Sequence, residues 1–245
     1  MTKIIAFKPN KSCPVHLSGF LVKRMEDYNF KNRYSDTTLN IDASLNQEWY
    51  KGLPSELVFV TWDRIIAFDI KKISTGDRVY LISQKFLDII KKFDILDETW
   101  VFFKVNLVYE KNKRMAEEKY YVIQKKVSKR YRVEQVLEGT KSIIKNVDLD
   151  EVEFGYENDI YEEEKKAYKV VFNEKASDDL FLVEYDKYPP ESNIYRYLYC
   201  SNAFAEELKK VELNGCQIID TEEIGMIDPV DLKPYEENMN YLTEL

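Results

Sequence analysis

The side chains that could perform nucleophilic or metal chemistry are few and widely spaced. His16 is the single histidine, so a Ser-His-Asp or Cys-His arrangement would have to use it. Cys13 lies only three residues earlier, too close along the chain for a nucleophile to be assumed aligned with its base. A closed zinc site needs four donors, and Cys200 and Cys216 are far away in sequence. The sequence therefore predicts no catalytic residues and no bound metal here.

Other enzyme signatures are weak as well. The seven glycines are isolated, and no phosphate-binding glycine motif follows a strand pattern, so we expect no nucleotide or other cofactor. The triplet Glu163-Glu164-Lys165 after Asp159 is compatible with a metal-dependent hydrolase. In a chain that is 33% charged, a solvated charged face explains the same residues.

A basic stretch between 119 and 132 suggests one kind of partner. Tyrosines alternate there with lysines and arginines, which could supply stacking platforms and phosphate contacts for RNA. The alternation of Tyr121, Ile123 and Val127 with polar residues also fits a half-buried edge strand. An RNA-binding accessory protein is therefore the alternative function, although a net charge of −8 disfavours binding to nucleic acid.

An acidic stretch between 148 and 164 suggests a different partner. It contains nine Asp or Glu residues and no Lys or Arg, interleaved with aromatic and aliphatic residues. Aromatic side chains can anchor a protein interface while carboxylates steer a basic partner, although an ordinary solvated loop has the same composition. The candidate partner-binding residues are Glu151, Glu153, Phe154, Tyr156, Glu157, Asp159 and Tyr161.

The apolar runs and the cysteines of the sequence indicate the cellular compartment of the protein. The residues from Met1 to Tyr28 lack the apolar run of a secretory signal, and no uncharged stretch is long enough to span a bilayer. Three cysteines without a CxxC pair are typical of buried thiols in a reducing compartment. We therefore expect a cytoplasmic protein that does not bind a membrane.

Short β-branched and aromatic runs predict many strands, and two amphipathic patterns predict helices over 83–93 and 201–211, each begun by a capping serine. The strand predictions are 3–7, 57–62, 64–70, 78–82, 100–109, 119–124, 168–172, 179–184 and 195–200. Aligning the two helices at an offset of 118 residues also aligns the flanking strands without a gap. This pattern favours an internal duplication. In the alignment Cys200 corresponds to Ile82, so we expect Cys200 to be a core residue.

The two aligned segments, Tyr80-Leu81-Ile82-Ser83-Gln84-Lys85-Phe86-Leu87-Asp88-Ile89-Ile90 and Cys200-Ser201-Asn202-Ala203-Phe204-Ala205-Glu206-Glu207-Leu208, resemble a motif of immunity proteins from bacterial polymorphic toxin systems. The typical form is V/I-S-x-K-F/L-x-D-I/L-L, and the resemblance covers roughly 79–124 and 194–220. The second copy departs from it with Cys200 for an aliphatic residue and Ala203 where lysine is common. The resemblance implies a cytoplasmic antidote that binds a cognate toxin without catalysis.

Together these observations predict an α+β fold with mainly antiparallel or mixed sheets and two related strand–helix–strand modules. We expect an N-terminal lobe over 1–145 with the first helix and a C-terminal lobe over 146–245 with the second, packed as one compact unit. The expected function is non-catalytic neutralisation of a cognate, basic toxin protein.

Overall fold

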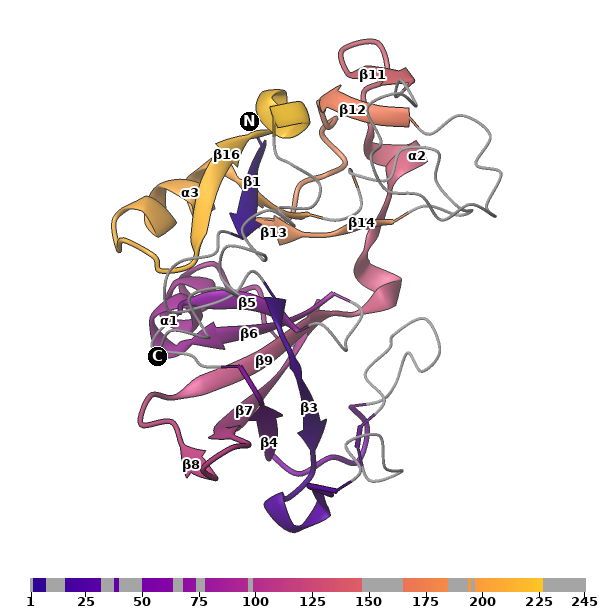
Figure 1. The fold of residues 1–245 in the computed structure, drawn as a ribbon. Coiled ribbons are helices and arrows are strands. Elements are labelled where there is room, and N and C mark those ends of the chain that lie inside the picture. Colours follow the sequence, from indigo (N-terminus) through magenta and orange to yellow (C-terminus); the bar gives the residue numbers. More distant parts are fainter. Residues whose placement is uncertain are drawn as a thin grey trace, which may run out of the picture. The chain divides into compact units, whose positions relative to one another are not determined.

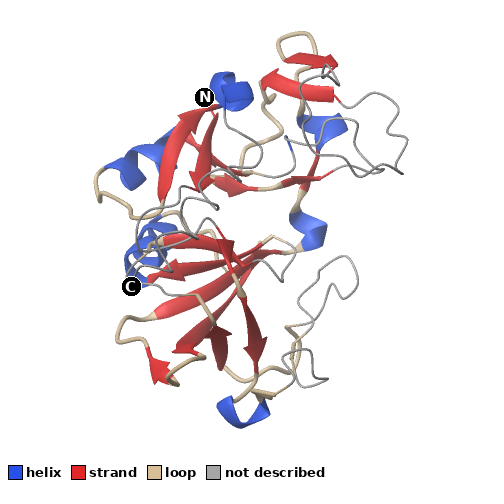
Figure 2. Cartoon of the chain, viewed as in Figure 1, coloured by secondary structure: helices blue, strands red, loops and turns tan. Residues whose placement is uncertain are grey.

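The computed structural model shows an α+β protein in which strands outnumber helices (Figures 1 and 2). The predicted fold class, with mainly antiparallel and mixed sheets, is confirmed. The structure describes residues 2–7, 16–31, 38–39, 50–63, 68–73, 78–96, 99–146, 165–184, 194 and 197–226.

The chain divides into two compact units, each assembled from three stretches. Unit 1 contains Met1–Ala6, Arg130–Ala205 and Ile218–Asp231, and unit 2 contains Phe7–Lys129, Glu206–Gln217 and Leu232–Leu245. This division differs from the two continuous lobes expected on either side of residue 145. The difference arises because the N-terminal strand pairs with residues near position 200, for example Thr2 opposite Ser201.

Unit 2 is built on an eight-stranded sheet in the order β2-β5-β6-β9-β7-β4-β3, with β8 paired to β7. Helix α1 (Gln84–Lys92) and two short 3-10 helices, η1 (Met25–Asp27) and η2 (Val127–Lys129), accompany it. The strands are β2 (His16–Leu17), β3 (Gly19–Val22), β4 (Glu56–Thr61), β5 (Ile70–Ile73), β6 (Val79–Ser83), β7 (Trp100–Tyr109), β8 (Arg114–Met115) and β9 (Tyr120–Lys125).

One face of this sheet carries a hydrophobic core that includes Phe59, Leu81, Leu107 and Val122. The alternating pattern of β-branched and aromatic residues produces this face, since successive side chains of a strand point to opposite sides.

Unit 1 is built on a four-stranded sheet in the order β13-β15-β1-β16. Its strands are β1 (Thr2–Phe7), β13 (Leu180–Phe181), β15 (Leu198–Ser201) and β16 (Cys216–Asp220), and helix α3 (Asn202–Lys209) follows β15. Two small ribbons complete it: β10 (Tyr131–Arg132) with β14 (Val183–Glu184), and β11 (Ile143–Asn146) with β12 (Lys165–Lys169). Short helices α2 (Val133–Val136) and η5 (Thr221–Met226) join the same core.

The predicted repeat is present as one arrangement of elements used twice. Helix α1 begins at Gln84 and α3 at Asn202, which is the predicted offset of 118 residues. The sheet order β5-β6-β9-β7 in unit 2 matches β13-β15-β1-β16 in unit 1. The N-terminal strand β1 thus takes the position that β9 holds in the first module. Cys200 is buried in β15, as predicted.

Several predicted strands are found within one or two residues, and four differ. The strand predicted over 179–184 is divided into β13 and β14, which pair in different sheets, and the one predicted over 195–200 begins at Leu198. Only 68–70 of the strand predicted over 64–70 lie among the described residues, and β5 begins at Ile70. The strand predicted over 168–172 instead ends at Lys169. After that residue the backbone leaves the ribbon, because the Val170 N–H donates to the Thr221 carbonyl at 2.9 Å.

Candidate partner-binding site

The seven candidate partner-binding residues, Glu151, Glu153, Phe154, Tyr156, Glu157, Asp159 and Tyr161, lie outside the described residues. The structure does describe the two strands that flank them. β11 and β12 pair antiparallel with Asn146 opposite Lys165 (Figure 1). Residues 147–164 therefore connect adjacent ends of one ribbon, so the ribbon defines where the acidic segment leaves unit 1.

The two faces of the ribbon have different environments. Ile144 and Ala167 lie opposite each other and pack in the unit 1 core. Ile143 and Tyr168, the next residues along each strand, have 45% and 38% of their surface exposed. A register shift between Ile143 and Ile144 places Ile143 opposite Lys169, so Tyr168 is the extra residue of a bulge. The Lys145 ammonium lies 5.6 Å from the centroid of the Tyr168 ring, which places both side chains on the outer face of the ribbon. Sequence reasoning assigned Tyr168 to a strand but did not identify this exposed face.

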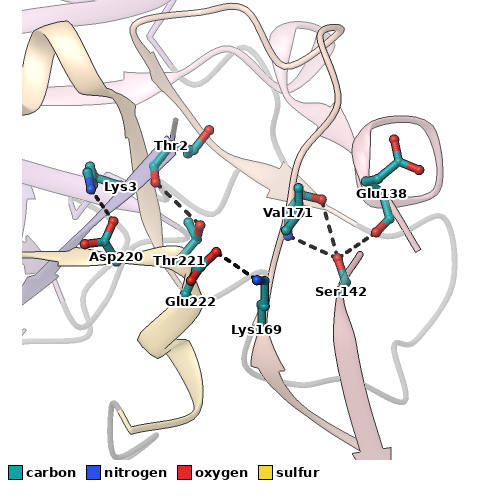
Figure 3. A network of polar contacts seen from close by, with 9 residues as sticks. All are labelled: Thr2, Lys3, Glu138, Ser142, Lys169, Val171, Asp220, Thr221 and Glu222. Carbon is teal, nitrogen blue, oxygen red and sulfur yellow. Dashed lines mark hydrogen bonds and ion pairs between the residues drawn. The ribbon is translucent and has the colours of Figure 1, made fainter. Parts of the chain in front are cut away.

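Hydrogen bonds at Ser142 close the base of the ribbon (Figure 3). The Ser142 hydroxyl donates to the Glu138 carbonyl at 2.9 Å and accepts the Val171 N–H at 3.1 Å. The Glu138 N–H in turn donates to the Val171 carbonyl at 2.8 Å. The segments before β11 and after β12 are therefore joined directly below the strands.

A second set of contacts connects the ribbon to η5 and β1 (Figure 3). The Lys169 ammonium pairs with Glu222 at 2.8 Å. Beside it, Thr221 donates to the Thr2 carbonyl at 3.5 Å, and Lys3 pairs with Asp220. The ribbon is thus attached through its own lysine to the helix that follows β16.

A hollow of about 350 Å³ lies next to this network. Asn173 is held there by its own hydrogen bonds: its amide donates to the Gln135 carbonyl at 3.0 Å, and its side-chain oxygen accepts the Lys175 N–H at 3.0 Å. The described residues of the lining combine apolar groups with hydroxyl, amide and carboxylate groups, without a cysteine or histidine among them. Its residues are Thr2, Val171, Phe172, Asn173, Glu174, Ala176, Thr221 and Glu222.

Unit 2 has a hollow of about 410 Å³ beside Asp69 and Ser83. The Ser83 hydroxyl donates to the Asp69 carboxylate at 2.7 Å and accepts the Phe86 N–H at 3.2 Å, which makes it the cap of helix α1. The second oxygen of Asp69 accepts the Asn214 N–H at 2.7 Å and lies 3.7 Å from the Lys85 ammonium. Ser83 therefore caps helix α1, and Asp69 anchors the loop at Asn214. Both residues have structural roles, and Ser83 does not act as a nucleophile.

The groups considered for other chemistry are dispersed. His16 begins the two-residue strand β2, whereas Cys13, Asp159, Glu163 and Glu164 lie outside the described residues. In the described ranges, no three His, Cys, Asp or Glu side chains gather where they could hold a metal ion.

Burial raises the pKa of the Cys216 thiol to about 12. The negative charge of Asp69 adds to this shift in pKa, and the positive charges of Lys71 and Lys85 oppose it. The thiol is therefore protonated at neutral pH.

The basic stretch considered for RNA does not form one exposed strip. Lys125 is fully buried, with its ammonium 5.6 Å from the Trp100 ring centroid. The Arg130 side chain is only 4% exposed and pairs with Glu184 at 3.4 Å. Tyr120 is buried against Phe68, with ring centroids 4.6 Å apart. Several residues considered for phosphate contact and stacking are thus used inside the fold, whereas Lys119 and Lys129 are exposed.

No helix within the described ranges is long and apolar enough to cross a membrane. The sequence matches no family model and no curated protein, so the function proposed below rests on the residues themselves.

Proposed function

We infer that this protein is a cytoplasmic, bacterial immunity protein that binds a cognate toxin domain and neutralises it without catalysis. The observation that carries this proposal is the ribbon whose two strands the acidic, aromatic-bearing segment connects. Residues 147–164 connect adjacent ends of the β11–β12 ribbon, and that ribbon is joined at its base through Ser142 and Lys169. An attached ribbon fixes the two points at which this segment joins unit 1, which favours recognition of a protein surface.

The chemistry of the segment indicates how it would neutralise a toxin. Carboxylates at Glu151, Glu153 and Glu157 attract a basic protein and pair with its Lys and Arg side chains, whereas Phe154 and Tyr156 provide apolar anchors. A basic toxin such as a nuclease would then be blocked by occlusion of the surface that binds its polyanionic substrate. The use of Ser83 and Ser142 as structural hydrogen-bonding groups supports a binding role over a catalytic one.

The first test is co-purification of the tagged, full-length protein with the product of its neighbouring reading frame, paired with growth of cells that express that product. We expect a stable complex and restored growth. A folded, toxic neighbour that neither binds nor is neutralised would overturn the proposal.

A second test measures association kinetics for the triple variant Glu151→Lys, Glu153→Lys, Glu157→Lys. Its on-rate at low salt should fall about ten-fold or more, because electrostatic steering acts mainly on association. The matched control is Glu26→Lys, Glu117→Lys, Glu134→Lys, which changes the net charge equally at exposed positions elsewhere. Equal on-rates for the two triple variants would remove the acidic segment from the interface.

A further inference from the structure

Two large hydrophobic side chains are exposed on the same face of the β11–β12 ribbon. In the described part of unit 1, Ile143 and Tyr168 are the large hydrophobic residues that the fold leaves exposed. Their neighbours Ile144 and Ala167 are turned into the core. The exposure is therefore a property of the outer face and not of a poorly packed segment.

Several contacts attach the base of this ribbon to the rest of unit 1. Ser142 joins the two segments at the base of the ribbon, Val170 donates to the Thr221 carbonyl, and Lys169 pairs with Glu222. A face that is already ordered loses little conformational entropy when a partner covers it. Exposed Tyr and Ile side chains on such a face can therefore contribute most of their burial energy to binding.

The charge on the face is positive. Lys145 lies beside the Tyr168 ring, and the β11–β12 register places position 145 opposite Lys166. A carboxylate supplied by a partner could pair with the Lys145 ammonium beside the Tyr168 ring.

The large exposed hydrophobics of unit 2 have different surroundings. Trp62 packs on Phe20 with ring centroids 5.6 Å apart, and Phe30 packs on Tyr28 at 4.9 Å under the Lys113 ammonium. Met115 is more exposed, at 54%, on the short strand β8. None of these side chains lies on a strand that leads directly into residues 147–164, as β11 and β12 do. Met115 therefore provides a matched control.

We propose that the outer face of the β11–β12 ribbon, formed by Ile143, Lys145 and Tyr168, is a second contact for the same protein partner. It fits a partner surface that places a carboxylate beside an aliphatic or aromatic side chain. This inference rests on the proposed function, because the partner is the toxin that the acidic segment binds. The two contacts have opposite charge, so together they define one orientation of the partner.

The test measures the dissociation constant of the purified toxin domain for the full-length protein carrying Tyr168→Ala or Lys145→Glu. We expect Tyr168→Ala to weaken binding about ten-fold or more, mainly through faster dissociation, as for buried aromatic anchors. Lys145→Glu should weaken binding most at low salt. Met115→Ala should bind like the unchanged protein, and circular dichroism should show that all three variants are folded.

The outcomes separate this inference from the proposed function. Binding by the unchanged protein, lost on charge reversal of the acidic segment but unaltered in Tyr168→Ala and Lys145→Glu, overturns the ribbon contact and leaves the function in place. Loss of binding in both ribbon variants, with unchanged binding by Met115→Ala, supports the ribbon contact. Absence of binding by the unchanged protein overturns both.

Discussion

The Ser83 hydroxyl donates a hydrogen bond of 2.7 Å to the carboxylate of Asp69, and the Asp69 carbonyl accepts the Ser83 N–H at 2.9 Å. The same pair of bonds joins Ser201 to Asp179, at 2.5 and 3.0 Å. In both modules the serine oxygen also accepts a backbone N–H three residues later and so caps the helix. Because the carboxylate orients the hydroxyl, an aspartate and a serine that are distant in sequence define each helix start.

Replacing the capping serines should destabilise each module. We expect Ser83→Ala and Ser201→Ala each to lower the free energy of unfolding by about 1 kcal/mol, the usual effect of losing a helix cap. Asp69→Ala should cost more, about 2–3 kcal/mol, because it also leaves the Asn214 N–H without its acceptor. Urea denaturation followed by circular dichroism measures these changes. Ser83→Thr, which retains a capping hydroxyl, and Ser128→Ala at an exposed position should have little effect.

Gly19 is required by a close approach between β3 and β4. A Cβ atom at this position would lie 2.4 Å from the Val60 carbonyl oxygen and 2.6 Å from the Phe59 ring. Gly19→Ala should therefore lower the melting temperature by several degrees, since overpacking costs about 1–3 kcal/mol. Gly139→Ala is the control, because a Cβ there has no atom within 4 Å. Equal melting temperatures for the two variants would contradict the β3–β4 packing.

Asp63 should make stability depend on pH in the acid range. Burial raises the pKa of this carboxyl, and the Ser18 N–H, which donates to it at 2.5 Å, opposes the shift in pKa only in part. A raised pKa in the folded protein means that folding favours the protonated form. The contribution of Asp63 to stability is therefore fully present below its pKa in the unfolded chain, which is about 3.9. It is lost as pH rises through the higher pKa of the folded protein.

The variant Asp63→Asn tests this dependence, because an amide oxygen can still accept the Ser18 N–H while carrying no charge. Its urea midpoint should equal or exceed that of the unchanged protein at neutral pH, and the difference should shrink as pH is lowered. A variant that is less stable at neutral pH and equally stable in acid would reverse the sign and contradict the burial of Asp63.

Cys216 should react slowly with thiol reagents in the folded protein. With a pKa of about 12, its thiolate fraction at pH 8 is about a thousand-fold below that of an ordinary thiol. Alkylation followed by peptide mass spectrometry measures the rate at this residue directly. Labelling should become normal in urea, and normal labelling without urea would show that the thiol is accessible and ionisable.

Sequence patterns predicted the helices and strands well where the pattern is local. The apolar spacing of Phe86, Leu87, Ile89 and Ile90 defines the buried face of α1, and all four side chains are buried. The boundaries of β7, over Trp100–Tyr109, agree with the prediction because the strand is long and rich in β-branched and aromatic residues.

The same patterns were misleading where burial depends on distant partners. Lys125 and Arg130 belonged to a basic stretch that suggested RNA binding, but one packs near Trp100 and the other pairs with Glu184. A long cationic side chain is buried when the fold brings it an aromatic ring or a carboxylate, and charge counts along the chain contain no such information.

The sequence by itself indicated the two capping serines and the 118-residue repeat, because a capping serine and the N–H that it accepts are only three residues apart. Only the tertiary structure decided that β1 lies between β15 and β16, and that Asn146 pairs with Lys165 at the ends of β11 and β12. Strand partners are chosen by hydrogen bonding and burial between residues far apart in sequence. Such choices depend on the whole core and not on any local pattern.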